Sequence, residues 1–178
     1  MIDLHTHILP GVDDGAKDME QALDMARQAA AHGVKTVAAT PHFLNVTWSE
    51  IKEKTAHFQQ VVRENGIALD VVVGAEIYVD PELIDLPADE IPTYNDAGRY
   101  CLIEFPMLEL PPYIDQVLFS LQVKGITPII AHPERYQAVI RNPNLAAGWI
   151  EAGCLIQMNA NSIRGLFGEK VPQPSKIM

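Results

Sequence analysis

Residues 1–15 read MIDLHTHILPGVDDG, and this opening stretch carries signals for both the fold and the chemistry. Its first seven residues predict a β-strand, on which side chains two residues apart point to the same face. His5 and His7 therefore point the same way. Neutral imidazoles pack poorly but bind metals well, and Asp13 and Asp14 follow closely. The stretch predicts a strand that ends in a pair of metal ligands.

The rest of the chain alternates short apolar runs with stretches of helical periodicity. Strands are predicted over residues 1–7, 34–42, 68–79, 99–105, 126–132 and 154–160. Helices are predicted over residues 19–32 with Asp18 as N-cap, 50–65 with Ser49 as N-cap, 113–125 and 144–153. This order is typical of the α/β class, with parallel strands joined by right-handed crossovers.

Such a sheet could be doubly wound or closed as a (β/α) barrel, and the placement of polar residues favours the barrel. Metal-binding residue types stand at or just past the ends of five successive predicted strands: His5 and His7, His42, Glu76, Glu104 and His132. A barrel builds its site at that end from many strands, whereas a doubly wound sheet uses its switch point.

The same residues, with Asp14, offer more ligands than one Zn²⁺ needs. Mixed imidazole and carboxylate donors suit Mn²⁺, Fe²⁺ or Zn²⁺, and the surplus carboxylates predict two or three ions bridged by a glutamate. Glu76 and Glu104 stand in apolar runs, where an unpaired carboxylate would be costly. Neighbouring ions can share a hydroxide and stabilise a phosphoryl group during its transfer.

The roles of several other polar residues are either undecided from the sequence or expected to be structural. Arg135 follows His132 by three residues and could bind a phosphate with two hydrogen bonds, or pair with a carboxylate at the surface. Of Asp13 and Asp14, one is expected to face the metals. His32 and His57 fall in predicted helices and are expected to be structural or exposed.

A cysteine-based phosphatase is excluded because its nucleophile needs an arginine six positions later, and Met107 and Ala160 stand six positions after Cys101 and Cys154. Both cysteines lie in apolar runs and are expected to be reduced, as in a cytoplasmic protein. The net charge of −10 argues against a nucleic-acid partner. Since no stretch is long and apolar enough to cross a bilayer, membrane insertion is not expected either.

The motifs HTHILPGVDDGAKD, TPHF, GAEIYV, LIEFP and AHPERY, in this order, resemble the polymerase and histidinol phosphatase (PHP) family. Within it they are similar to the manganese-dependent protein-tyrosine phosphatases of bacterial capsular and exopolysaccharide synthesis. The resemblance runs from residue 1 to about residue 169. It implies a distorted (β/α) barrel with a trinuclear metal centre. It also implies a phosphotyrosyl protein as the substrate, namely a tyrosine kinase that controls polysaccharide polymerisation and export.

Position by position, the resemblance implies seven metal ligands and one arginine. The ligands are His5, His7, Asp14, His42, Glu76, Glu104 and His132, with Glu76 bridging two ions. Arg135 matches the family's catalytic, phosphate-binding arginine, and Asp14 is preferred over Asp13. Mn²⁺ is the implied metal, with Fe or Zn as alternatives.

The chain departs from the family pattern after LFGE, where KVPQPSKIM follows in place of a further helix and a strand with an Asp-x-His pair. A (β/α) barrel typically needs about 250 residues. The expectation is therefore a single PHP domain over residues 1–178, incomplete at its C-terminal end, with an open sheet edge. Association with a second copy of the chain is one way to cover that edge.

Two other functions share this ligand set. One is a phosphatase of a small phosphomonoester such as histidinol phosphate. The other is a non-catalytic chain that binds metal or a phosphotyrosyl peptide without processing it. The compact opening motif and the residues of the GAEIYV and LIEFP motifs favour the protein-tyrosine phosphatase.

Overall fold

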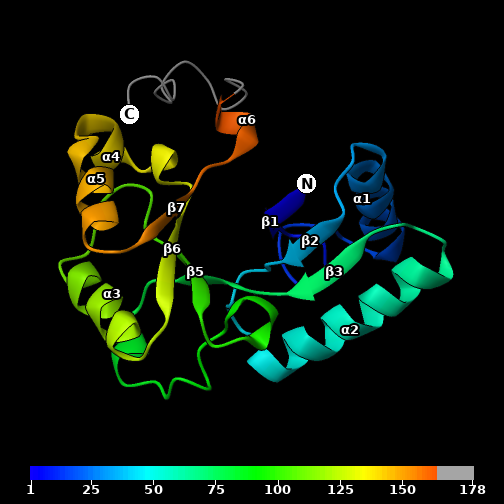
Figure 1. Ribbon diagram of the computed structural model, residues 1–178, viewed down its shortest axis with the longest axis horizontal. Helices are drawn as coiled ribbons and strands as arrows, with labels where there is room; N and C mark the ends of the chain where they lie inside the picture. Colours follow the sequence, from blue (N-terminus) through cyan, green and yellow to red (C-terminus); the bar gives the residue numbers. More distant parts are fainter. Residues whose placement is uncertain (164–178) are drawn as a thin grey trace. The chain divides into compact units, whose positions relative to one another are not determined.

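The computed structural model describes residues 1–163 (Figure 1). The described residues form two compact units: the first contains residues 1–77 and 89–101, and the second contains residues 78–88 and 102–163. The single domain over residues 1–178 stays a prediction. The segment KVPQPSKIM, on which the expectation of an incomplete domain rested, lies outside the described residues.

The first unit is built on a parallel three-stranded sheet in the order β1-β2-β3. Its strands are β1 (Ile2–Thr6), β2 (Thr36–Ala39) and β3 (Asp70–Val73). Asp3 of β1 pairs with Val37 of β2, and Thr36 of β2 pairs with Asp70 of β3. The pairing of β1 with β2 shifts its register between Asp3 and Thr6. The crossovers are helices α1 (Met19–Ala31) and α2 (Trp48–Glu64). The α/β class with parallel strands is confirmed here.

Helix α1 begins as predicted, because the Asp18 side chain accepts a hydrogen bond from the Gln21 backbone N–H. Helix α2 differs: its N-cap is Thr47, and the prediction of Ser49 was wrong. Thr47 and Glu50 form a capping box, which satisfies two backbone N–H groups reciprocally and so fixes the start of the helix two residues earlier. The helix packs on β3.

The apolar run over residues 68–79 was predicted as one strand, and the structure corrects this. It forms two strands, β3 and β4 (Glu76–Tyr78), which belong to different sheets. Gly74 lies between the two strands, where a Cβ atom would be 2.9 Å from the Thr40 side chain. A residue without a side chain lets the backbone pass this close. Glu76 consequently stands at the start of a strand instead of inside one.

The second unit carries a four-stranded sheet in the order β4-β5-β6-β7. Its other strands are β5 (Tyr100–Glu104), β6 (Thr127–Ala131) and β7 (Leu155–Gln157), and β6 and β7 pair in parallel. The helices are α3 (Ile114–Val123), α4 (Gln137–Arg141), α5 (Asn144–Glu151) and α6 (Ala160–Ile163). Two short 3₁₀ helices of this unit, η1 (Pro81–Ile84) and η3 (Pro133–Arg135), were not predicted, and neither was η2 (Tyr94–Asp96) in the first unit.

Each unit has its own buried apolar side chains. In the first unit Ile51, Phe58 and Val62 line the inner face of α2, following its helical period. In the second unit the ring of Phe105 contacts those of Tyr136 and Trp149. Both predicted free cysteines are buried, and burial raises the pKa of the Cys154 thiol to about 11.

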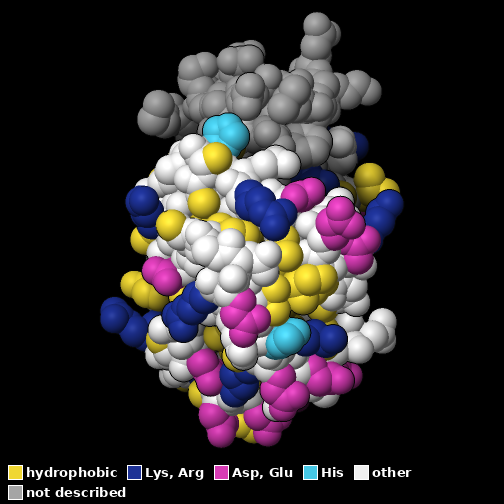
Figure 2. Space-filling view, turned by 90° about the vertical axis from the view of Figure 1, so that its right-hand side faces the viewer, with side chains coloured by type: hydrophobic (Ala, Val, Ile, Leu, Met, Phe, Trp, Pro, Cys, Tyr) yellow, Lys and Arg dark blue, Asp and Glu magenta, His cyan; other side chains and the backbone are white. Residues whose placement is uncertain are grey.

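Figure 2 shows one face of the molecule, the right-hand side of Figure 1, where α1 and α2 lie. Acidic and basic side chains are interspersed on this face, with apolar side chains between them. Across residues 1–163, every helix is too short or too polar to span a lipid bilayer.

Candidate metal centre

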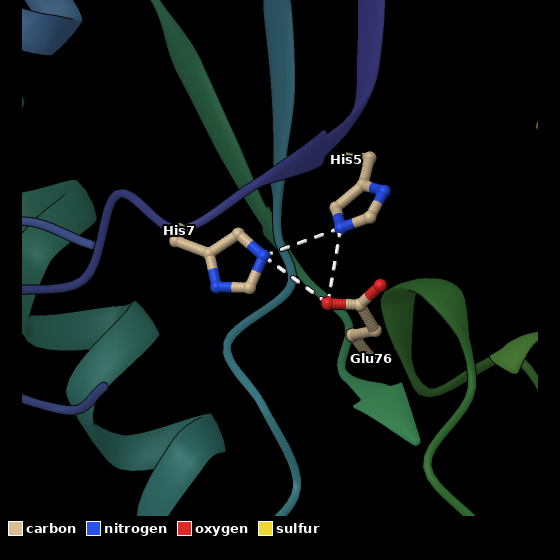
Figure 3. A group of neighbouring side chains, drawn as sticks. All are labelled: His5, His7 and Glu76. Atoms are coloured by element: carbon tan, nitrogen blue, oxygen red, sulfur yellow. Dashed lines mark hydrogen bonds and ion pairs between the residues drawn. The ribbon is translucent and has the colours of Figure 1, made fainter. Parts of the chain in front are cut away.

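Three imidazoles of the first unit converge on one carboxylate oxygen. The Glu76 side chain is only 1% exposed, and its Oε2 atom lies 3.2 Å from His5 Nε2, from His7 Nε2 and from His42 Nδ1. The two Nε2 atoms of His5 and His7 are themselves 3.2 Å apart, which gives the triangle drawn in Figure 3. A buried carboxylate is therefore surrounded by nitrogen donors at contact distance.

Backbone pairing explains why these residues meet. His5 lies on β1, and His7 follows its last residue. The segment after β2 runs parallel to the start of β4, since Glu76 N–H donates to Pro41 O and Phe43 N–H donates to Glu76 O. His42 lies between these two bonds, in a bridge with Glu76. The ends of β1 and β2 and the start of β4 thus supply the cluster.

The donor set fits a divalent cation. Imidazole nitrogens and carboxylate oxygens are the ligands of Mn²⁺, Fe²⁺ and Zn²⁺, and the candidate ligand atoms of His5, His7 and Glu76 lie within 4.8 Å of one another. A second such group contains His7, Asp14 and His42. A cation also satisfies the negative charge of Glu76, which is otherwise costly to bury.

The two neighbouring aspartates stand in different environments. The Asp13 side chain is 7% exposed, and that of Asp14 is 80% exposed. Asp14 Oδ1 lies 3.6 Å from both His7 Nδ1 and His42 Nε2, within the second group of candidate ligands. Asp13 Oδ2 accepts a 2.6 Å hydrogen bond from His7 Nδ1–H. Sequence reasoning left Asp13 without a role, and its contacts give it one.

These contacts change the ionisation of His7 in the metal-free protein. Burial lowers the pKa of the His7 imidazole, but the hydrogen bonds and negative charges of Asp13 and Glu76 outweigh it and raise this pKa to about 10. Burial raises the pKa of Asp13, but hydrogen bonds from His7, Gly15 and His42 bring it below its usual range. At neutral pH the His7 imidazole of the metal-free protein is therefore protonated.

The loop over residues 8–16 folds back tightly onto His7. Ala16 N–H donates to His7 O, and Gly11 N–H donates to Ala16 O, with Gly11 at φ +64°. A Cβ atom on Gly15 would lie 2.0 Å from His7 O and 2.4 Å from His7 Cβ. Only glycine allows this close approach, so the loop that carries both aspartates depends on it.

In the second unit Glu104 and His132 lie together. Glu104 ends β5, His132 follows β6, and His132 Nε2 is 3.6 Å from Glu104 Oε1. The His132 side chain is 2% exposed. Its backbone is left-handed, with φ 30° and ψ 54°, a conformation that costs energy for a residue other than glycine and occurs preferentially at functional sites.

A buried tyrosine that sequence reasoning missed supports this pair. Tyr136 is fully buried; its hydroxyl donates to Ala131 O at 2.7 Å and accepts from Phe105 N–H at 2.9 Å. It thereby ties together the ends of β5 and β6, next to Glu104 and His132. Its motif, AHPERY, was visible in the sequence and contains one partner, Ala131, but the other partner, Phe105, is 31 positions away and was not predicted.

The structure thus brings together five of the seven predicted ligands in the first unit and the other two in the second unit. Those five are His5, His7, Asp14, His42 and Glu76. Arg135 ends η3 and is partly exposed. His32 and His57 are exposed, as expected.

The sequence pattern of the family described as "Capsular polysaccharide synthesis, CpsB/CapC" matches residues 1–178. The chain belongs to this CpsB/CapC family. It is 38% identical to "Tyrosine-protein phosphatase YwqE" of Bacillus subtilis, covering 96% of this chain and 69% of that protein. It is also 38% identical to "Tyrosine-protein phosphatase CpsB" of Streptococcus pneumoniae, covering 96% of this chain and 72% of that protein.

A solved structure supports the same family. It is described as "Crystal structures of YwqE from Bacillus subtilis and CpsB from Streptococcus pneumoniae, unique metal-dependent tyrosine phosphatases". The TM-score is 0.90 at 37% identity, covering 96% of this chain and 71% of the other. The predicted fold class and the predicted resemblance to the capsular branch of the PHP family are confirmed by these matches.

Proposed function

We propose that this chain is a metal-dependent protein-tyrosine phosphatase that hydrolyses phosphotyrosine on a protein substrate. The observation that carries the proposal is the meeting of three imidazole nitrogens at one buried oxygen of Glu76, each at 3.2 Å. The CpsB/CapC relatives, named as tyrosine-protein phosphatases, give the substrate class.

The first unit would hold metal ions through His5, His7, Asp14, His42 and Glu76. Glu76 is the proposed bridging ligand, because its Oε2 atom is the contact shared by all three imidazoles. In the second unit Glu104 and His132 are the proposed ligands. When bound, divalent metal supplies hydroxide at neutral pH and neutralises charge on the phosphoryl oxygens. Mn²⁺ is the proposed ion, and the same donors accept Fe²⁺ or Zn²⁺.

Arg135 is the proposed phosphate-binding residue. It stands three residues after His132, at the end of η3, and is partly exposed. A guanidinium presents a planar fork of donors that matches two phosphate oxygens, and it stays charged at every physiological pH. Binding the phosphate there would orient the ester for attack without a side-chain nucleophile.

The proposed substrate is a bacterial tyrosine kinase that regulates capsular or exopolysaccharide synthesis, so we place the reaction in the cytoplasm. The family description names capsular polysaccharide synthesis. A kinase of this process would carry the phosphotyrosine that a tyrosine-protein phosphatase removes. Neither a nucleic-acid partner nor membrane insertion is part of this proposal, and association with a second copy stays a prediction.

The test is phosphate release from a phosphotyrosyl peptide during a titration with Mn²⁺, comparing the wild-type chain with Glu76→Ala. Loss of a bridging carboxylate is expected to lower turnover on the order of 10³-fold, because such a ligand stabilises charge at the reacting centre. Glu53→Ala, an exposed change on α2, is the matched control and should turn over normally. Near-normal turnover in Glu76→Ala would refute the metal site, and turnover on histidinol phosphate alone would refute the substrate class.

A further inference from the structure

The Asp13 carboxylate is hydrogen-bonded to two proposed ligand residues, His7 and His42, and to the loop that carries Asp14. Its Oδ2 atom accepts hydrogen bonds from His7 Nδ1–H at 2.6 Å and from the His42 backbone N–H at 2.9 Å. Its Oδ1 atom accepts one from the Gly15 backbone N–H at 3.0 Å. The side chain is 7% exposed. All three donors belong to segments that carry proposed ligands.

We infer that Asp13 is a positioning residue that fixes which nitrogen of His7 binds metal and holds His7 and His42 in one arrangement. The inference rests on the proposed function to the extent that His7 is taken as a metal ligand. It assigns to Asp13 a task separate from that of Asp14, its exposed neighbour in the sequence.

The hydrogen bond to His7 decides the tautomer. A neutral imidazole carries its proton on one nitrogen and can bind metal only through the other. Asp13 accepts the proton-bearing Nδ1, so Nε2 is left as the ligand, and His7 Nε2 is the atom 3.2 Å from Glu76. Carboxylate partners of this kind orient metal-binding histidines and raise their basicity.

The two backbone bonds join separate parts of the cluster. His42 follows β2 and Gly15 lies in the loop after β1, and one carboxylate holds both. Its oxygens are acceptors only, which suits three donors. An asparagine has a single acceptor oxygen and would turn its NH₂ group toward one of these donors. The three donors therefore require an aspartate, because of its negative charge and because both of its oxygens accept hydrogen bonds.

The decisive measurement is direct binding of Mn²⁺ to the full chain by titration calorimetry, comparing wild type with Asp13→Asn. Loss of such an outer partner typically weakens metal affinity about 10- to 100-fold, and this is the expected result. Asp24→Asn is the matched control: it removes one acidic charge from α1, where Asp24 pairs with Arg27 at the surface. Its affinity for Mn²⁺ should equal that of the wild type.

The dependence of turnover on Mn²⁺ concentration distinguishes a residue that positions a ligand from a residue that is a ligand. In Asp13→Asn the Mn²⁺ concentration needed for half-maximal phosphatase activity should rise, while turnover at saturating Mn²⁺ should stay within about threefold of wild type, because every ligand remains. In His7→Ala, turnover should stay low at any Mn²⁺ concentration. An Asp13→Asn protein that binds Mn²⁺ as tightly as wild type and is equally folded by circular dichroism would overturn the inference.

A second readout needs no variant. With Zn²⁺ as a diamagnetic probe, long-range ¹H–¹⁵N spectra of the wild-type chain should show His7 metal-bound at Nε2 and protonated at Nδ1. Coordination through Nδ1 would overturn the inference even if Asp13→Asn failed to fold, and a wild type that bound neither ion would overturn both proposals. A wild type that bound Mn²⁺ but released no phosphate would contradict the proposed function alone.

Discussion

The proposed ligands of the first unit and those of the second are supported in different ways. In the first unit, the proposed ligands His5, His7 and Asp14 come from one short segment that a loop folding back on itself brings together. His42 and Glu76 join them from distant segments. In the second unit, Glu104 and His132 are far apart in sequence, and a fully buried tyrosine joins the strand ends that carry them. One support is local and the other is long-range.

The difference predicts different consequences of mutation. Contacts within a short loop fail when that loop cannot form, and the side chains that the loop carries are then displaced together. A buried hydroxyl that joins two strands is part of the core, so its loss acts on stability as well as on the ligands. The predictions that follow test this distinction.

The largest expected effect is that of Gly15→Ala. The new Cβ atom would lie 2.0 Å from His7 O, against backbone that cannot move aside cheaply. The loop must then shift, displacing His7 and both aspartates, and we expect a destabilisation of about 3 kcal/mol with loss of tight Mn²⁺ binding. Thermal unfolding and calorimetric titration with Mn²⁺ measure the two effects.

The matched control is Gly148→Ala in α5, where nothing lies within 4 Å of the new Cβ atom. Alanine is the better helix former, so this change should stabilise the protein by up to about 1 kcal/mol. Normal Mn²⁺ affinity in Gly15→Ala would show that the loop adapts and that the local support is weaker than inferred.

Tyr136→Phe tests the long-range support and is expected to cost about 2 kcal/mol, because the Phe105 N–H and the Ala131 carbonyl lose a buried partner. Urea denaturation measures the cost, and exposed Tyr100→Phe is the control. Activity should also fall, since His132 and Glu104 flank the lost bonds. A stable variant with reduced activity would mean that Tyr136 acts on the ligands and not on the core.

Much of the first unit could be predicted from the sequence because its signals are local. The two-residue spacing of His5 and His7 requires only a strand, and Asp18 as N-cap marks the start of α1. The candidate ligands stood out in the sequence because buried carboxylates and paired imidazoles are costly without a partner or a metal ion. The choice between Asp13 and Asp14 was different, since it depends on how the loop folds back on His7.

The errors arose where distant contacts decide the structure. The run over residues 68–79 is apolar throughout, and periodicity gives no sign that Gly74 passes close to Thr40 and separates β3 from β4. Similarly, one hydrogen bond of Tyr136 joins it to Phe105, which is 31 positions away. Such pairings follow from the topology, and single-residue preferences do not encode them.

The ionisation of His7 predicts that Mn²⁺ binding depends on pH. The pKa of His7 in the metal-free protein is about 10, above the usual 6.5. The interactions of protonated His7 with Asp13 and Glu76 therefore stabilise the folded metal-free protein fully below pH 6.5. This contribution is lost as the pH rises through about 10. Because a metal ion must displace the proton, the Mn²⁺ affinity should increase by about tenfold per pH unit across this window.

Calorimetry in two buffers of different ionisation enthalpy counts the protons released on binding, and one proton from His7 is expected. The exposed His57→Ala variant should release the same number as wild type. Binding that is independent of pH would contradict a protonated His7 in the metal-free protein.

The smallest expected effect lies away from both sets of ligands, at the start of α2. Thr47→Ala removes a capping-box side chain and should cost about 1 kcal/mol, whereas exposed Ser49→Ala should change stability by less than about 0.5 kcal/mol. Urea denaturation distinguishes the two variants. Neither should alter Mn²⁺ affinity, because α2 packs on β3 and carries none of the proposed ligands. A loss of affinity in Thr47→Ala would mean that the cluster is sensitive to the stability of the whole first unit, and that the local support inferred for its loop is incomplete.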